Sequence, residues 1–279
     1  MDTSVLGLLL PLPTATDSKY SRGTVGFVTG SERYPGAALL GVAAAQATAV
    51  GFVRYVGPRR VADLMLLAHP EVVVAETTDS VGPTQCWVVG SGIANAIDPQ
   101  AANVSAALAV AEVAVVDAGA LDLIGERTDE PIGHHLLTPH QGELCRLLNR
   151  LELGFWHPER LDNPDEAEKA VKLAAEFTGQ TVLLKGSFTR VAAANGEYIE
   201  VGPNSAWLAT AGTGDVLAGL LGGIAAQNSE VAAKNWLDIA QLAIQLHSLA
   251  AEIASQAGVV TASTVASAIP QAVRQRFNR

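Results

Sequence analysis

The residues of this sequence that could do chemistry together lie in Thr210–Gly219, which reads Thr-Ala-Gly-Thr-Gly-Asp-Val-Leu-Ala-Gly. Gly212 and Gly214 free the backbone to curl just before a predicted helix, so unpaired N–H groups at the helix start can converge on a phosphate. We expect Gly212, Thr213 and Gly214 to form this anion hole. Asp215 would lie beside the phosphate, where its carboxylate could take a proton from an attacking hydroxyl group.

An aspartate at a helix start has a second interpretation, because Asp is also a favoured N-cap residue. An N-cap alone does not require two preceding glycines, so the pattern favours anion binding. The segment is not a Walker loop, since no Gly-Lys-Ser/Thr follows it, and it does not match the dinucleotide-binding fingerprint. The motif therefore indicates phosphate chemistry of another class.

A second candidate segment lies upstream, where an apolar strand expected at Thr181–Lys185 ends in Lys-Gly-Ser-Phe-Thr. A lysine at the carboxyl end of a strand, followed by glycine and hydroxyl groups, can reach phosphate oxygens. A solvated surface lysine is the alternative interpretation of Lys185.

Four other expected strands end in loops of small or polar residues: Gly30-Ser31, Gly90–Gly92, Asp117–Gly119 and Thr138–His140. Ligands of open α/β sheets bind beyond the carboxyl ends of the strands, and a glycine lets the backbone approach a ligand closely. One such loop could be a plain turn. Four of them together predict a site along one edge of the sheet.

The elements that position these loops follow from the alternation of apolar β-branched runs with Ala- and Leu-rich stretches, which is typical of βα units in a mostly parallel sheet. We expect strands at Thr24–Thr29, Phe52–Val56, Val72–Val74, Cys86–Val89, Val113–Asp117, Leu136–Thr138, Thr181–Lys185 and Arg190–Ala194. We expect helices at Gly36–Val50, Arg59–Ala68, Pro99–Ala111, Gln141–Asn149, Pro164–Thr178, Asp215–Gln227, Val231–Gln256 and Thr261–Phe277. Asn195-Gly196 before Tyr198–Val201 predicts a hairpin, and thus an antiparallel edge.

Composition narrows the class of protein. The chain has 279 residues, of which 49% are hydrophobic, 16% charged and 5% aromatic. Such a chain is neither disordered nor a coiled coil, and its small aliphatic residues suit helices packed closely on a sheet. We expect one α/β domain over residues 1–279. The net charge of −10 argues against binding nucleic acid or an anionic membrane by bulk electrostatics.

Cys86 and Cys145 lie in apolar surroundings without metal-ligand spacing, which favours two buried thiols in a reduced, cytoplasmic protein and predicts no metal-ligating side chains. The apolar run near the N-terminus follows no Lys or Arg and is interrupted by Pro11 and Pro13, so we expect no signal peptide. Gly36–Val53 is mostly Ala and Gly, which favours a buried helix over a membrane span.

Taken together, these segments resemble the ribokinase-like superfamily and, within it, the ADP/ATP-dependent NAD(P)H-hydrate dehydratase family. The similar segments run through nearly the whole chain: Lys19–Gly23, Gly30-Ser31, Tyr34–Leu40, Gly90–Gly92, Asp117–Leu121, Leu137–Glu143, Lys185–Thr189 and Thr210–Gly219. The Gly-Thr-Gly-Asp element alone marks the superfamily, whereas the histidine-containing loop and the Tyr-Pro-Gly-Ala-Ala-Leu-Leu helix start select the dehydratase. Ser91 and Gln141 stand where the family has proline. The resemblance implies a three-layer α/β/α fold.

The resemblance also implies an activity. ADP would phosphorylate the ring hydroxyl of the S-epimer of NADH or NADPH hydrate, and phosphate would then depart as the nicotinamide double bond reforms. The products would be NAD(P)H, AMP and inorganic phosphate, so the enzyme would be a hydro-lyase of nicotinamide nucleotide repair. Asp215 would be the catalytic base. The resemblance leaves the choice between ADP and ATP open.

By the same resemblance, the nucleotide would contact Gly214 and the segment Lys185, Gly186, Ser187, Phe188 and Thr189. Ala38, Gly92 and His140 would line the hydrate pocket with Asp215, although a buried structural histidine is the alternative for His140. We expect Mg²⁺ as a cofactor, because phosphoryl transfer needs more charge neutralisation than one lysine supplies.

The implied partners are NADH or NADPH hydrate, ADP, and further copies of the chain, since members of the family are often tetrameric. The epimerase that some members carry as a second domain would be a separate polypeptide here. Two alternatives stay open at this point. One is a small-molecule kinase of the same superfamily, and the other is a non-catalytic nucleotide-binding protein.

Overall fold

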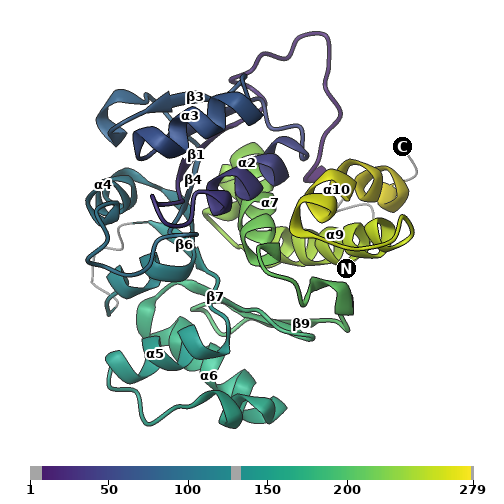
Figure 1. Cartoon of the computed structure of the whole chain (residues 1–279). Helices are drawn as coiled ribbons and strands as arrows, with labels where there is room; N and C mark the ends of the chain where they lie inside the picture. The colour runs from purple at the N-terminus through teal and green to yellow at the C-terminus, as the bar shows by residue number, and fades with distance from the viewer. Residues whose placement is uncertain (1–7, 127–132, 278–279) are drawn as a thin grey trace.

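A nine-stranded sheet runs through the computed structural model, which describes residues 8–126 and 133–277 (Figure 1). The strand order is β3-β2-β1-β4-β5-β6-β7-β8-β9, parallel up to β7 and antiparallel for β8 and β9. The strands are β1 (Thr24–Val28), β2 (Phe52–Val56), β3 (Val73–Ala75), β4 (Cys86–Val89), β5 (Val113–Val116), β6 (His134–Leu137), β7 (Thr181–Leu184), β8 (Thr189–Ala192) and β9 (Tyr198–Val201). The predicted mostly parallel sheet with an antiparallel edge hairpin is confirmed.

Helices cover both faces of the sheet, so the predicted three layers are confirmed as well. One buried cluster joins the sheet to α2, α3, α7, α9 and α10, and a second cluster on the other face joins it to α4, α5 and α6. The α-helices are α2 (Gly36–Gln46), α3 (Arg59–Ala68), α4 (Ala101–Val110), α5 (Gln141–Arg150), α6 (Pro164–Thr178), α7 (Thr213–Gln227), α8 (Ser229–Ala232), α9 (Leu237–Ser255) and α10 (Ala262–Phe277). Four short 3₁₀ segments are η1 (Thr78–Ser80), η2 (Ala118–Leu123), η3 (Pro158–Asp162) and η4 (Ala206–Leu208).

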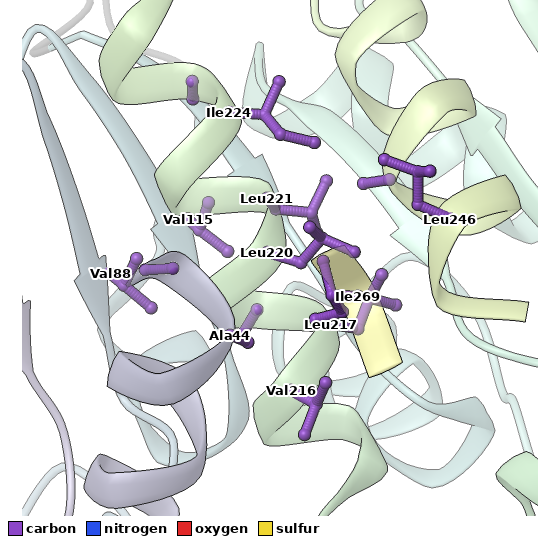
Figure 2. Packing of buried hydrophobic residues seen from close by; sticks show 14 of the residues in the cluster. Ala44, Val88, Val115, Val216, Leu217, Leu220, Leu221, Ile224, Leu246 and Ile269 are labelled. Atoms are coloured by element: carbon purple, nitrogen blue, oxygen red, sulfur yellow. The ribbon is translucent and has the colours of Figure 1, made fainter. Parts of the chain in front are cut away.

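Helix α7 is the central element of the first cluster. Figure 2 shows its Leu220 and Leu221 among side chains of the sheet, α2, α9 and α10. A Cβ atom at Gly219 would lie 2.0 Å from the carbonyl oxygen of Gly41 in α2, and one at Gly222 would lie 2.1 Å from Val88 in β4. Only glycine allows such close packing. These contacts hold α7 directly against α2 and β4.

The structure corrects three predicted helix boundaries. The helix expected at Gly36–Val50 ends at Gln46, because the Thr48 hydroxyl donates to the Ala45 carbonyl and Ala49 takes a left-handed conformation with φ 63°. The single helix expected at Val231–Gln256 is wrong, since the segment forms two helices, α8 and α9, with a non-helical connection between them. There the Asn235 side chain accepts a hydrogen bond from the Leu237 N–H and starts a new helix.

The third correction concerns the helix expected to begin at Asp215. Helix α7 begins at Thr213, and its N-cap is Gly212. Asp215 therefore lies inside the first turn, and the interpretation of Asp215 as a plain N-cap is wrong.

The remaining sequence predictions about cysteines and membranes can also be compared with the structure. Cys86 and Cys145 are both free and buried, as predicted. None of the helices in the described residues is long and apolar enough to cross a bilayer.

Candidate functional site

The segment Gly212–Gly214, which comprises the N-cap and the first two residues of α7, is called the glycine turn here, and it lies at the end of the sheet where the parallel strands finish. Gly212 has φ 91°, and a Cβ there would lie 2.7 Å from the Leu40 side chain and 3.0 Å from Ala262. Thr213 fixes the turn, because its hydroxyl donates to the carbonyls of Leu208 and Thr210 at 2.7 and 2.8 Å.

The hydrogen bonds also show which N–H groups of the predicted anion hole already have an acceptor. The N–H of Thr213 already donates to the Thr210 carbonyl at 3.3 Å, whereas helical geometry leaves the following N–H groups of the first turn without an intrahelical acceptor. The positive end of the helix dipole adds to their attraction for an anion. In this structure Thr213 holds the glycine turn, and the amides that follow it face the site.

Asp215 lies in the first turn of α7 with its carboxylate folded back toward Gly212. Its Oδ2 atom is 3.9 Å from the point where a Cβ of Gly212 would lie. Burial and the nearby Asp117 raise the pKa of Asp215 to about 6, while Lys185 acts to lower it. A carboxylate with this pKa accepts a proton more readily than an exposed aspartate does and is still ionised near neutral pH.

Lys185 follows β7 and is no surface lysine, since only 20% of its side chain is exposed. Its Nζ lies 2.7 Å from Asp117 Oδ1 and 3.8 Å from Glu143 Oε2. The same atom is 3.7 Å from the point where a Cβ of Gly214 would lie. Burial disfavours the ammonium, but the two carboxylates outweigh that effect and hold the pKa of Lys185 above its usual value.

Asp117, at the end of β5, is the partner that connects the loops of this edge. It is 3% exposed and accepts hydrogen bonds from Ser91 Oγ, Thr138 Oγ1 and Lys185 Nζ at 2.8, 2.9 and 2.7 Å. Burial alone would raise its pKa, but the Lys185 charge and these hydrogen bonds bring the pKa of Asp117 below the usual value. The carboxylate is therefore ionised inside the protein.

Sequence reasoning noted the loop that contains Asp117 but gave the side chain no role, and it passed over Glu143 in the same way. The sequence did contain a signal that both could belong to the site, because both are acidic residues that directly follow buried strands or their loops. Neither sequence position shows that its partner is Lys185.

A cavity of about 430 Å³ opens beside the glycine turn. It brings together five residues predicted to contact the nucleotide: Lys185, Gly186, Ser187, Thr189 and Gly214. Phe188, the sixth, is not among the lining residues, and the residue is 40% exposed. Asn204 holds the loop in place, since its Nδ2 donates to the Gly186 carbonyl and to Thr189 Oγ1, both at 2.9 Å.

The lining of this cavity also includes apolar side chains, those of Leu208, Leu217 and Ile244, and the imidazole of His247 in α9. His247 is 5% exposed, and burial lowers its pKa to about 4, so the ring is neutral. A cavity lined by a charged group, hydroxyl groups and apolar side chains suits a nucleotide, which has charged phosphates and an apolar base.

The residues predicted to line the substrate pocket are brought together in part. Gly92 has φ 73°, and a Cβ there would lie 2.6 Å from Ala37 and 3.0 Å from the Gly30 Cα. A Cβ at Gly30 would in turn lie 3.0 Å from Ala38. The loops after β1 and β4 thus meet the start of α2, with no room for larger residues.

His140 lies at the end of β6, two strands away from Gly92 in the sheet order. It caps α5: its Nδ1 accepts from the N–H groups of Gly142 and Glu143 at 3.0 and 3.3 Å, and the Glu143 side chain accepts from the His140 N–H. The side chain is 56% exposed, so the alternative of a buried histidine is wrong. Because Nδ1 is an acceptor, the proton of the neutral ring is on Nε2, which faces Glu143 Oε1 at 3.3 Å.

The fit of a Mg²⁺ ion to this site can be tested from its donors. In the part of the chain that the structure describes, no group of three or more His, Cys, Asp and Glu side chains could hold a metal ion. Asp117 and Glu143 face the Lys185 ammonium. Mg²⁺ usually keeps several waters and binds substrate phosphates, so the ion would come with the nucleotide, and we assign no residue of this chain to it.

The mostly parallel sheet between two helical layers, with its antiparallel edge and a glycine turn beside a partly buried aspartate, defines a three-layer α/β protein with the fold of a ribokinase-like superfamily protein from Enterococcus faecalis. Sequence comparison narrows the class, since the family model described as NAD(P)H-hydrate dehydratase matches residues 25–271. The chain belongs to this family, as its motifs predicted.

Three known proteins show the extent of the similarity. The bifunctional NAD(P)H-hydrate repair enzyme Nnr of Mycobacterium tuberculosis is 37% identical over 220 residues, which cover 77% of this chain and 43% of the relative. The ADP-dependent (S)-NAD(P)H-hydrate dehydratase of Neisseria meningitidis is 30% identical over 278 residues, 95% of this chain and 88% of the relative. The chain thus spans about half the length of the bifunctional relatives and most of the monofunctional one.

The fold has solved counterparts. The crystal structure of the ADP/ATP-dependent NAD(P)H-hydrate dehydratase from Bacillus subtilis, co-crystallised with ATP and Mg²⁺, aligns with a TM-score of 0.81. The alignment covers 99% of this chain and 97% of that chain at 22% identity, and it supports the fold.

Proposed function

We propose that this chain catalyses the ADP-dependent dehydration of the S-epimer of NADH or NADPH hydrate and so regenerates the reduced nucleotide. The observation that carries the proposal is Asp215, a partly buried carboxylate with a pKa of about 6 in the first turn of α7, next to the glycine turn. Membership of the family and the name of the Neisseria meningitidis relative support the substrate and the choice of ADP.

In the proposed reaction, the nucleotide lies in the cavity lined by Lys185, Gly186, Ser187 and Thr189, with its phosphates at the glycine turn. Asp215 takes the proton from the ring hydroxyl as the hydroxyl oxygen attacks the terminal phosphoryl group of ADP. The bond to AMP breaks, and the first-turn amides of α7 stabilise the charge on the transferred group. The C–O bond then breaks and inorganic phosphate leaves with the bonding electrons. The neighbouring ring carbon loses a proton to water, and the electrons of that C–H bond reform the ring double bond.

Mg²⁺, bound to the nucleotide, would neutralise phosphate charge. The chain's own net charge of −10 makes this local help necessary, since both substrates are anions. Lys185 supplies the fixed positive charge beside Gly214.

On the substrate side, we propose that Ala38, Gly92 and His140 line the hydrate pocket. The small residues let the nicotinamide ring approach the loops after β1 and β4 closely. The His140 ring is half-exposed, and its Nε2–H is the group that can donate to the substrate.

Three further properties are part of this proposal. Residues 1–279 act as one catalytic domain, and the protein is cytoplasmic and forms homo-oligomers. The two free, buried thiols support a cytoplasmic protein, because thiols stay reduced in that compartment.

The test is an incubation of the protein with Mg²⁺, NADH hydrate and either ADP or ATP, followed by absorbance of the reduced nicotinamide. We expect recovery of the chromophore with ADP, together with one AMP and one phosphate for each NADH. Nucleotide consumption without recovery of the chromophore would instead indicate a kinase, and tight nucleotide binding without any turnover would indicate a non-catalytic protein.

A further inference from the structure

One buried carboxylate, Asp117, ties together the loops that end β4, β6 and β7. Its donors are the Ser91 hydroxyl, the Thr138 hydroxyl and the Lys185 ammonium, all within 2.9 Å. A carboxylate that needed only to be neutralised would not require two further donors. The three hydrogen bonds hold Asp117 ionised and in one orientation at the base of the site.

Lys185 is the next link from Asp117 to the proposed reaction. Its Nζ lies 2.7 Å from Asp117 Oδ1 and 3.7 Å from the Cβ position of Gly214 at the start of α7. Asp215 is the next residue in that turn. Glu143 faces the same ammonium from α5 at 3.8 Å. The charges around the turn are therefore one cation and three carboxylates.

The other elements packed against α7 add little charge at its first turn. Strands β1 and β5 and helix α2 contain no titratable side chain. The titratable side chains of the remaining elements are held neutral by burial or lie away from that turn: Cys86, Glu230, Asp238, His247, Glu252, Arg274 and Arg276. The proton affinity of Asp215 is thus set mainly by burial, Asp117 and Lys185.

We propose that Asp117 is a positioning residue that sets the basicity of Asp215, because it holds Lys185 beside the glycine turn and offsets the lysine's charge. The inference rests on the proposed function insofar as Asp215 is the base. Without Asp117, the ammonium would face Asp215 unopposed and would make it a weaker base. Without Lys185, Asp117 would repel the Asp215 carboxylate unopposed and would make it a stronger base. With neither charge, the basicity of Asp215 would lie between these two extremes.

The first test compares pH profiles of hydrate dehydration for the wild type, Asp117→Asn and Lys185→Met. We expect the acid limb of kcat to move about one pH unit lower in Asp117→Asn and to higher pH in Lys185→Met, since a removed like charge and a removed opposite charge shift a pKa in opposite directions. Affinity for ADP should not fall in Asp117→Asn, because a negative charge is lost, but it should fall in Lys185→Met.

A purely structural role for Asp117 predicts a different pattern. Activity and ADP affinity would then fall together in Asp117→Asn while the acid limb stays in place, and this result would overturn the proposal. Thr138→Val is the matched control, since it removes one hydrogen bond to Asp117 and keeps the charge; its acid limb should coincide with that of the wild type.

Two further measurements test the proposal if Asp117→Asn does not fold or if the enzyme shows no turnover. The double variant Asp117→Asn with Lys185→Met removes both members of the Asp117–Lys185 ion pair, and its acid limb should lie below that of Lys185→Met alone. The Asp215 carboxyl group can also be titrated directly by carbon NMR in the wild type and in Asp117→Asn. Failure of wild-type dehydration would refute the proposed function, whereas equal Asp215 titration in both proteins would refute this inference.

Discussion

The proposed nucleotide side and the proposed substrate side of the candidate site are formed by different kinds of residue. On the proposed nucleotide side, buried charges hold one another in place: Lys185 and Asp117 lie 2.7 Å apart beside the glycine turn. On the proposed substrate side, small residues such as Ala38 and Gly92 make close backbone contacts, and the one polar side chain, His140, is half-exposed.

The comparison teaches how an acidic protein can bind two anions. The nucleotide side is organised before the ligand arrives, because its charges already have partners and the turn is held by Thr213. Fixed charges and amides of this kind stabilise a transferring phosphoryl group without reorganisation. The substrate side provides shape instead of charge. Changes on the two sides should therefore have different signatures.

The largest effect is expected where the two sides meet, at Asp215. Asp215→Asn removes the proton acceptor and keeps the shape, so kcat should fall by about a thousandfold, within the range of general-base contributions. Affinity for ADP, measured by calorimetry, should stay near that of the wild type. If this variant keeps activity within a fewfold of the wild type, Asp215 is not the base.

The next effect concerns the packing that holds the nucleotide side in place. A Cβ at position 219 would lie 2.0 Å from the Gly41 carbonyl, so Gly219→Ala must push α7 away from α2. We expect a loss of about 1–3 kcal/mol in the free energy of unfolding, as for other overpacked cores, and weaker ADP binding.

Denaturant unfolding checks this prediction, and Gly36→Ala serves as the matched control. A Cβ at Gly36 meets no atom within 4 Å, so this change should leave stability equal or raise it by up to about 1 kcal/mol. Equal stability of Gly219→Ala and the wild type would show that α7 does not depend on this contact.

The smallest effect is expected on the substrate side, at His140. His140→Ala removes both the cap of α5 and the Nε2–H donor, so it should cost about 1 kcal/mol of stability and raise KM for the hydrate about tenfold. His140→Asn supplies a favoured N-cap, and it should restore stability while KM stays high. Steady-state kinetics and thermal unfolding separate the two roles. A wild-type KM in His140→Asn would exclude His140 from the substrate pocket.

Much of the fold was predictable because its signals are local. The β-branched runs predicted the strands, Asn195-Gly196 predicted the edge hairpin, and Gly212–Asp215 predicted a turn that leads into a helix. The break between α8 and α9 was missed, because Trp236 is buried and continues the apolar pattern across it.

The role of Asp117 could not be predicted for another reason. Its partner Lys185 is 68 residues further along the chain, and the two meet only because β6 alone separates β5 from β7 in the sheet. Glu143 depends on the same topology. Local sequence shows which residue types follow the strands, whereas the pairing of charges needs the order of the strands.

The most direct test of the account is the pH dependence of kcat for hydrate dehydration by the wild-type protein with saturating ADP and Mg²⁺. Since Asp215 must be ionised to accept the proton and its pKa is about 6, the rate should be constant above neutrality. It should fall tenfold per unit below about pH 6, and the residual rate of Asp215→Asn should lack this limb. A wild-type rate that stays constant down to pH 5, or the same limb in Asp215→Asn, would contradict the account.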